Sequence, residues 1–218
     1  VSLAAMAATR DIAAAARAAL APMKLDATVL VGGINAEMAD IREMTQADFL
    51  RVAGLCLGVI FLIVLALMKD PLLSAFMVSA TVLSYLATLG ISAWVFTGLL
   101  GQAGLDWKVE IFLFVVLIVV GQDYNLFLAS RLAQEAVSLP PLRAIRRALI
   151  PTGPVISSCG IIMAATLGSL MAGHLQTLRQ LGFALALGMI LDTFIVRPLL
   201  LPAFVALTGR TGGRRRGA

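Results

Sequence analysis

The sequence predicts an all-α membrane protein, in which a bundle of five transmembrane helices follows the end of an α+β domain. First, 60% of the 218 residues are hydrophobic and only 13% are charged, whereas soluble domains are about 45–50% apolar and about 25% charged. Second, the mean hydropathy is +0.97. Third, the basic residues lie mostly in segments that connect apolar runs, so the formal net charge of +5 indicates membrane topology and no nucleic-acid partner.

The first 48 residues differ in composition from the rest of the chain. Residues 2–20 are rich in alanine but include three charges, which is typical of an amphipathic helix that contacts solvent. Residues 24–31 are β-prone, and the charges in residues 35–48 suit a polar surface helix. This order predicts that residues 1–48 are the end of an extracytoplasmic α+β domain. Because the other strands of such a domain are not in the sequence, we expect a fragment of a longer protein.

Five apolar segments follow, and each is long enough to cross a hydrocarbon core about 30 Å thick. Two prolines, Pro151 and Pro154, are expected in the opening turns of the fourth span, where proline is least costly. The predicted bundle occupies residues 49–208, and residues 209–218 form a basic tail. The predicted spans are residues 49–68, 72–100, 109–130, 148–172 and 178–207.

The charges in the connecting segments predict the orientation of the bundle. Loop 131–147 contains four arginines, the tail contains four more, and Lys69 falls on the same side of the membrane. The opposite loops, 101–108 and 173–177, contain only Lys108 as a lysine or arginine. The positive-inside rule therefore places the tail in the cytoplasm and residues 1–48 outside, in a multi-pass protein of the cytoplasmic membrane.

Small residues recur at every fourth position in four of the predicted spans. Such stripes let helix backbones approach closely in lipid, and four of them in one chain indicate a compact bundle. The stripe of the last span ends at Asp192, which is therefore expected to face protein. The stripes are Gly54 and Gly58; Ala80, Ser84, Thr88 and Ser92; Gly160, Ala164, Gly168 and Ala172; and Ala184, Gly188 and Asp192.

The most informative polar group lies inside the third span. Asp123 is roughly 12 Å along the helix from Arg131, so it is submerged in the bilayer. A carboxylate at that depth costs on the order of 3 kcal/mol by insertion scales and marks a functional site by default. The adjacent Tyr124 and Asn125 are expected to form a polar cluster around it. Ser157, in the fourth span, is a candidate for a hydrogen bond between helices.

Asp192 and Arg197 are the other charged residues at depth. They are five residues apart, or about 140° around an α-helix, and so do not form an ordinary i,i+4 pair. Two nearby prolines are able to unwind the helix and change this angle. Two interpretations of Arg197 stay open, namely pairing with Asp192 or extension toward the headgroups.

The sequence has no arrangement of residues typical of an enzyme or a metalloprotein. Cys56 and Cys159 lack metal-ligand spacing, and the single histidine, His174, is in a predicted outer loop. An intramembrane enzyme requires a nucleophile with a base, or metal ligands, at depth. We therefore expect no enzymatic activity, no metal and no cofactor.

Three segments resemble the MMPL branch of the resistance–nodulation–division (RND) transporters. Residues 121–131, GQDYNLFLASR, resemble its G-x-D-Y-N…SR signature. Residues 181–197, LGFALALGMILDTFIVR, with the prolines that follow, resemble its last transmembrane helix, and residues 148–160 are similar to the helix before it. The drug-efflux branch typically has a lysine in the signature helix, and none is present here. The five spans then correspond to helices eight to twelve of a twelve-helix transporter, and residues 1–48 to the end of its second porter domain.

This resemblance implies an exporter of lipids or other hydrophobic compounds that is driven by the proton-motive force. In the family, the Asp-Tyr pair of the tenth helix meets a matching pair on the fourth helix, so Asp123 and Tyr124 are implied as the proton relay. Asn125, Ser157, Asp192 and Arg197 are candidates for supporting it. The implied partners are membrane lipid, protons and the missing N-terminal half or a partner chain, with an oligomer as a further candidate. The alternative is a lipid-sensing module without transport activity, related to sterol-sensing domains.

Overall fold

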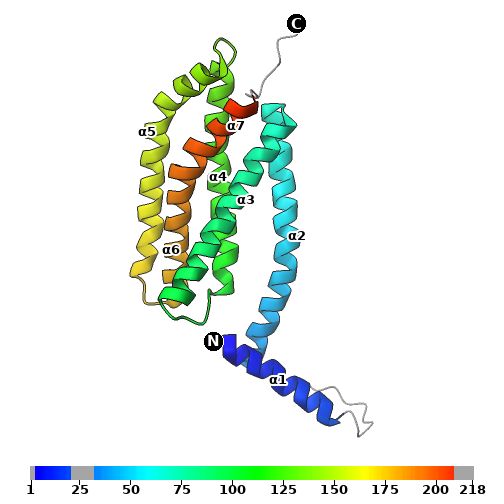
Figure 1. Ribbon diagram of the computed structural model, residues 1–218. Coiled ribbons are helices and arrows are strands. Elements are labelled where there is room, and N and C mark those ends of the chain that lie inside the picture. The colour runs from blue at the N-terminus through cyan, green and yellow to red at the C-terminus, as the bar shows by residue number, and fades with distance from the viewer. Residues whose placement is uncertain (1–2, 21–31, 209–218) are drawn as a thin grey trace. The chain divides into compact units, whose positions relative to one another are not determined.

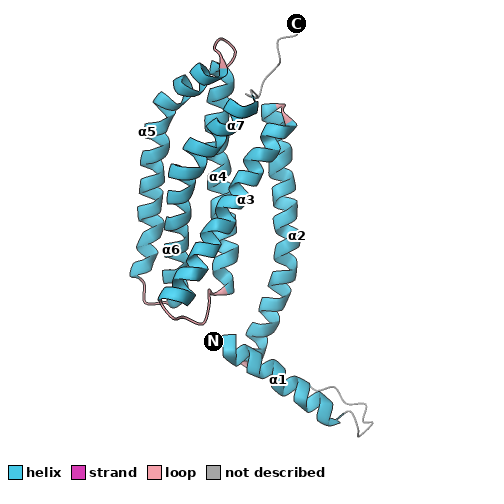
Figure 2. Cartoon of the chain, viewed as in Figure 1, coloured by secondary structure: helices cyan, strands magenta, loops and turns pink. Residues whose placement is uncertain are grey.

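The structure is a computed structural model that describes residues 3–20 and 32–208. Figures 1 and 2 show that these residues form helices joined by short loops, and they contain no strand. The elements are α1 (Leu3–Leu20), α2 (Ile34–Met68), α3 (Pro71–Trp94), the π-helix η2 (Val95–Leu99), α4 (Trp107–Glu135), α5 (Pro141–Gly168), the 3-10 helix η3 (Ser169–Ala172), α6 (Gln176–Leu191), the π-helix η4 (Asp192–Leu200) and α7 (Leu201–Thr208).

The chain divides into two compact units, residues 1–55 and 56–218. In the first unit, α1 confirms the helix predicted for residues 2–20. The surface helix predicted for residues 35–48 is the beginning of α2, which continues through residue 48 into the first span because no proline or glycine interrupts it there. The predicted strand at residues 24–31 lies outside the described residues, so the α+β domain stays a prediction.

Five helical segments of the described chain are long and apolar enough to cross a membrane, as predicted. In the second unit, α4 packs against α3, α5 and α6, and α6 also packs against α3 and α5. Figure 1 shows these four helices side by side. The protein is therefore an all-α bundle of membrane-spanning helices.

The turn between α2 and α3 is set by three consecutive residues. Lys69 adopts a left-handed conformation with φ 54°, which reverses the chain direction. The carboxylate of Asp70 then accepts hydrogen bonds from the backbone N–H groups of Leu72 and Leu73, at 3.0 and 3.2 Å. Pro71 occupies the first position of α3, where its missing N–H leaves no helical bond unmade. Two successive spans are thereby joined without a long loop.

The start of α5 differs from the prediction. The helix begins at Pro141, so Pro151 and Pro154 lie inside it and not in its opening turns. Residues 141–147 were predicted as part of loop 131–147 because the apolar run begins at residue 148, but Pro141 supplies a favourable helix start and no breaker follows before residue 151. Each internal proline removes one hydrogen bond from the helix.

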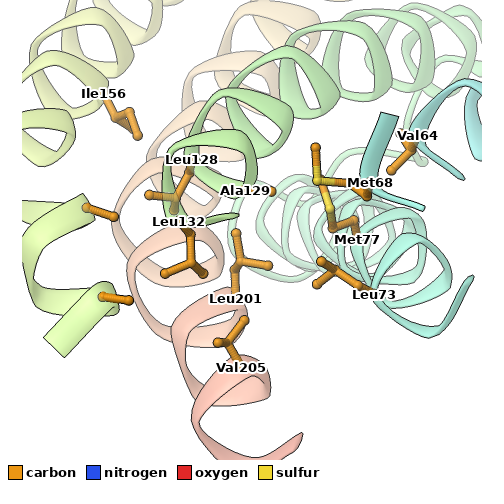
Figure 3. Packing of buried hydrophobic residues seen from close by; sticks show 12 residues of the cluster. Val64, Met68, Leu73, Met77, Leu128, Ala129, Leu132, Ile156, Leu201 and Val205 are labelled. Carbon is orange, nitrogen blue, oxygen red and sulfur yellow. The ribbon is translucent and has the colours of Figure 1, made fainter. Parts of the chain in front are cut away.

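The hydrophobic core of the second unit lies at the end of α2, the beginning of α3, the end of α4, the beginning and middle of α5, and α7. Figure 3 shows buried residues of this cluster, which come from α2, α3, α4, α5 and α7. The stacked rings of Phe76 and Phe204, whose centroids are 4.1 Å apart, pack at this core. The buried members are Val64, Met68, Leu73, Met77, Leu128, Ala129, Leu132, Ala144, Ala148, Ile156, Leu201 and Val205.

The small-residue stripes differ in how deeply they are buried. The stripes of α3 and α6 are buried throughout, and the prediction that Asp192 faces protein is confirmed. The stripe of α5 is buried at Gly160 and Ala164 but exposed at Ala172. Gly54 and Gly58 of α2 are exposed. A small-residue pattern alone therefore does not identify the helix faces that meet in this chain.

At the other end of the second unit, one side chain fastens the loop between α3 and α4 to α6. Gln180, which is 1% exposed, accepts a hydrogen bond from the backbone N–H of Asp106 at 2.8 Å. Its amide group donates to the side-chain oxygen of Gln102 and to the carbonyl of Gly104, at 2.8 and 3.0 Å. The hydroxyl of Thr177 adds a bond to the Asp106 carboxylate at 2.7 Å. We call these four hydrogen bonds the loop clamp.

Candidate functional site

The candidate site begins in η4, where the last span changes from α-helix to π-helix. Residues Asp192–Leu200 form this π-helix, and Pro198 lies inside it. Proline lacks the backbone N–H that an α-helix needs, and its ring clashes with the carbonyl four residues earlier. A π-helix bonds residues five apart, so residues i and i+5 lie about one turn apart on the same side. Asp192 and Arg197 have this spacing.

The guanidinium of Arg197 donates a hydrogen bond from Nη2 to Oδ2 of Asp192, and the two groups form an ion pair. The side chains are 1% and 2% exposed. The sequence left two interpretations of Arg197 open. In the structure Arg197 pairs with Asp192 and does not extend toward the headgroups. The wider π turn replaces the 140° separation of an ideal α-helix, which is why the pair forms.

The ion pair is incompletely satisfied by the described residues. Oδ1 of Asp192 and the Nε and Nη1 atoms of Arg197 are buried and have no hydrogen-bond partner. Removing either partner of a buried pair leaves a charge without compensation, which costs roughly 3–5 kcal/mol in soluble proteins. The pair is therefore a unit whose two members depend on each other.

Arg197 also contacts α4 through Tyr124. The guanidinium carbon lies 4.4 Å from the centroid of the Tyr124 ring, which is cation–π geometry. The Tyr124 hydroxyl is directed toward α5 and donates a weak hydrogen bond to Sδ of Met163 at 3.9 Å. Tyr124 thus links the ion pair of the last span to α4 and α5.

A second polar group joins α3 to α4. Thr81 Oγ1 accepts hydrogen bonds from the side-chain amides of Gln122 and Asn125, at 2.9 and 3.1 Å. All three side chains are buried. A Cβ atom added at Gly121 would be 3.0 Å from Cγ2 of Thr81 and 3.7 Å from Oδ2 of Asp192. Gly121 therefore allows α4 to approach both the threonine and the ion pair.

Close packing of α5 also depends on a glycine. A Cβ atom added at Gly160 would overlap the side chain of Thr193 and lie 2.8 Å from its Cβ. Thr193 follows directly after Asp192 in η4, so this contact fixes the distance between α5 and the ion pair. The glycine is required here because no larger residue leaves room for Thr193.

Asp123 is placed differently from its neighbours. Its side chain is exposed, and it has no hydrogen bond or ion pair within the described residues. Successive α-helical residues point about 100° apart, so Asn125 faces α3 and Tyr124 faces Arg197 while Asp123 faces away. The polar cluster expected around Asp123 is therefore not formed by the described residues. Asp123 remains near the middle of the span, roughly 18 Å along α4 from Glu135.

The structure brings Tyr124, Asp192 and Arg197 together and holds Asn125 on the adjoining threonine. Ser157 is half-buried on α5, and no hydrogen bond joins it to these residues within the described chain. Sequence reasoning missed Thr81 as an acceptor, although its spacing from Ser84 and Thr88 put it on the stripe face of α3. It also left Gln122 without a role, although an amide at membrane depth requires a partner.

The donor types at the site limit its chemistry. Among residues 3–20 and 32–208, no three or more histidine, cysteine, aspartate or glutamate side chains are grouped so as to hold a metal ion. The site combines an exposed carboxylate, a buried ion pair and a phenol within one membrane-spanning bundle. Ionisable groups at membrane depth are rare and mark candidate functional sites.

These features define a multi-pass α-helical membrane protein with ionisable groups inside the bilayer. The sequence model of the MMPL family matches residues 2–217. The chain therefore belongs to the MMPL family.

Similar proteins occur in Streptomyces coelicolor and Mycobacterium tuberculosis. The chain is 44% identical over 184 residues to SCO5905 of Streptomyces coelicolor, covering 84% of this chain and 22% of that protein. It is 36% identical over 232 residues to the "Sulfolipid-1 exporter MmpL8" of Mycobacterium tuberculosis, covering 99% of this chain and 21% of that protein. It is 33% identical over 185 residues to the "Probable transport protein MmpL12" of the same species, covering 85% of this chain and 16% of that protein. The chain thus spans about a fifth of the length of these relatives.

Proposed function

We propose that this chain is the C-terminal transmembrane part of a secondary transporter driven by the proton-motive force. The transporter exports lipids or other hydrophobic compounds across the cytoplasmic membrane, and it is not an enzyme. Membership of the MMPL family supports this function, as does the similarity to a protein named as a sulfolipid-1 exporter. The whole transporter includes an N-terminal half or a partner chain.

The observation that carries the proposal is the position of Asp123. An ionised carboxylate facing hydrocarbon costs on the order of 3 kcal/mol, and charged residues in spans face protein or a water-filled path almost without exception. Asp123 faces away from the described bundle at mid-span. We infer that the missing half of the transporter covers this face of α4, and that Asp123 binds and releases the transported proton there.

Tyr124 and the ion pair support the relay from inside the bundle. The permanent charge of Arg197 lies under the Tyr124 ring, one residue after Asp123. Hydrogen bonds from Gln122 and Asn125 to Thr81 hold α4 in one rotation about its axis. In this proposal Asp123 and Tyr124 together form the proton relay. Asn125, Asp192 and Arg197 hold the side chains of these two residues in position.

Protonation changes the charge of Asp123 and so changes which helix packing is favoured. A bundle with two arrangements then shifts its population toward the one that binds the neutral carboxyl better. Moving one charge through a potential of 100 mV supplies about 2.3 kcal/mol, which is enough to bias such an equilibrium by more than tenfold. Repeated binding and release of protons would thereby drive export.

The proposal is tested in the complete transporter by Asp123→Asn. The amide keeps the shape of the carboxylate but does not ionise, so proton-driven export by the variant in liposomes should fall to background while its melting temperature stays near wild type. Asp48→Asn, which removes an exposed carboxylate outside the predicted span, is the matched control and should transport normally. Wild-type flux per folded Asp123→Asn molecule would exclude the relay, whereas an absence of export by the wild-type transporter would favour the lipid-sensing alternative.

The orientation is also part of the proposal. We infer that the loop between α4 and α5 is cytoplasmic and that the loop between α5 and α6 is outside, because the arginines gather in the former. In a variant of the complete transporter without its native cysteines, Ser138→Cys should react with a membrane-impermeant thiol reagent only after permeabilisation. His174→Cys should react in intact cells. The opposite pattern would reverse the orientation.

A further inference from the structure

A cluster of basic side chains lies at the end of the second unit where α4 leads into α5. Residues 131–147 contain four arginines and one glutamate, which leaves a net charge of +3. We call this group the arginine cluster; it consists of Arg131, Arg143, Arg146 and Arg147. The proton relay proposed above does not use it.

The single acid of this segment neutralises only part of the cluster. Glu135 lies 3.4 Å from Nε of Arg147 and 4.0 Å from Nη2 of Arg131, and its side chain is 18% exposed. This carboxylate is therefore shared between the last turn of α4 and the second turn of α5. Arg143 and Arg146 are exposed and form no ion pair within the described residues. Two guanidinium groups are thus left with uncompensated charge.

Helix geometry places the uncompensated arginines on one side of α5. Residues three and four apart share a helix face, so Arg143, Arg146 and Arg147 are neighbours. Ala144 and Ala148, which are both fully buried in the hydrophobic core, point at least about 100° away from Arg143 and Arg146 around the helix. The first turns of α5 are consequently anchored to the bundle on one face while the arginines project from the other.

The surface next to the arginines is apolar. Ile150 is 66% exposed and Ile161 is 55% exposed, and both belong to the membrane-spanning part of α5 on the same face as the arginines. Ile150 follows Arg146 by four residues, or about 6 Å along the helix. The guanidinium groups therefore lie where headgroup phosphates border the hydrocarbon, and the apolar side chains below them are available to acyl chains. A soluble anion would use the charges but not this apolar surface.

We propose that the arginine cluster binds the phosphate headgroup of an anionic membrane lipid, whose acyl chains lie along Ile150 and Ile161. The planar guanidinium donates two parallel hydrogen bonds to phosphate oxygens, which makes arginine well suited to this ligand. Arg143 and Arg146 supply the main contacts because Glu135 does not neutralise them. The proposal is independent of the cargo and of the proton relay.

The test measures lipid binding to the purified complete transporter in detergent by native mass spectrometry. The probes are phosphatidylglycerol and phosphatidylcholine of identical acyl chains. We expect the transporter to bind phosphatidylglycerol at least tenfold more tightly. Arg143→Gln combined with Arg146→Gln should weaken phosphatidylglycerol binding roughly 30-fold, since each basic residue near an anionic surface contributes about fivefold. Binding of phosphatidylcholine should not change.

The matched control is Lys108→Gln combined with Arg179→Gln, which removes two positive charges from the other end of the second unit. It should bind phosphatidylglycerol like wild type, and circular dichroism should show the same helix content in all variants. An equal loss of phosphatidylglycerol binding in the control would mean that net charge alone sets the affinity, and would overturn the proposal. Unchanged binding in the arginine variant would also overturn it, as would displacement of the lipid by inorganic phosphate at equal concentration.

Discussion

The guanidinium carbon of Arg197 lies 4.4 Å from the centre of the Tyr124 ring, while the same side chain donates to Asp192. One buried cation is thus shared by an acid of its own helix and an aromatic ring of α4. A cation–π contact is worth about 0.5–1 kcal/mol when exposed and about 2 kcal/mol when desolvated. The energy of this contact is therefore large enough to hold the ring of Tyr124, the residue that follows Asp123, in position.

The ring of Tyr124 should matter more for stability than its hydroxyl. Tyr124→Phe keeps the aromatic face over Arg197 and loses only a weak hydrogen bond to Met163, so the free energy of unfolding should change by less than about 1 kcal/mol. Tyr124→Leu removes the ring and should cost about 2 kcal/mol. Reversible unfolding of the purified chain in mixed detergent micelles measures both values. Equal losses in the two variants would show that the ring contact contributes nothing.

Asp192 and Arg197 should depend on each other strongly. Arg197→Met leaves a buried carboxylate unpaired and Asp192→Leu leaves a buried guanidinium unpaired, so each should lower the free energy of unfolding by roughly 3–5 kcal/mol. The double variant replaces both charges with apolar groups and should recover most of that loss. The same unfolding assay, arranged as a double-mutant cycle, gives the coupling energy. Additive losses would contradict a mutual dependence.

Thr81 should stabilise the contact between α3 and α4. Thr81→Val keeps the shape of the side chain but removes the hydroxyl oxygen that accepts from Gln122 and Asn125. Both side-chain amides then lose this hydrogen-bond acceptor. Hydrogen bonds between membrane helices average about 0.6 kcal/mol each, so the expected loss is about 1–2 kcal/mol. Thr166→Val is the control, because that hydroxyl is exposed and bonds only to Ile162 of its own helix. Equal stability of the two variants would argue against the proposed link.

Gly160 should not tolerate a side chain. A methyl group there overlaps Thr193, so Gly160→Ala should destabilise the bundle by about 1–3 kcal/mol, the usual cost of overpacking. Gly153→Ala on the same helix meets no atom within 4 Å and should melt within a few degrees of wild type. Thermal unfolding of both variants, followed by circular dichroism, makes the comparison. A Gly160→Ala variant as stable as the control would mean that α5 and η4 are less tightly packed than the structure indicates.

The number of spans and the position of Asp123 along its helix were predictable from sequence because they depend on linear properties of the chain. The length of an apolar run sets whether it is able to cross the bilayer, and the rise per residue sets the distance of Asp123 from the helix ends. The start of α5 was not predictable in the same way, because the helix begins before the apolar run at residue 148. Arg143 is nevertheless helical, since Pro141 begins the helix and the buried Ala144 secures it.

The side-chain partners were harder to predict because they depend on angles around the helix axis. An ideal α-helix separates Asp192 from Arg197, and only the π turn near Pro198 brings them together. Asp123 and Tyr124 were grouped because they are adjacent in sequence, yet adjacent helical residues face different directions. Which of them meets Arg197 depends on how α4 is rotated, and Thr81 on another helix determines that rotation.

The loop clamp has a practical consequence for where this protein accepts foreign sequence. Gln180 holds the α3–α4 loop through bonds to Gln102, Gly104 and Asp106, so inserted residues would pull at least one of these groups away from a buried amide. The α4–α5 turn has only local backbone bonds near its exposed tip at Ser138, for example from Ser138 N–H to the Glu135 carbonyl. An epitope tag or a fluorescent protein is therefore better placed beside Ser138 than anywhere in residues 102–106.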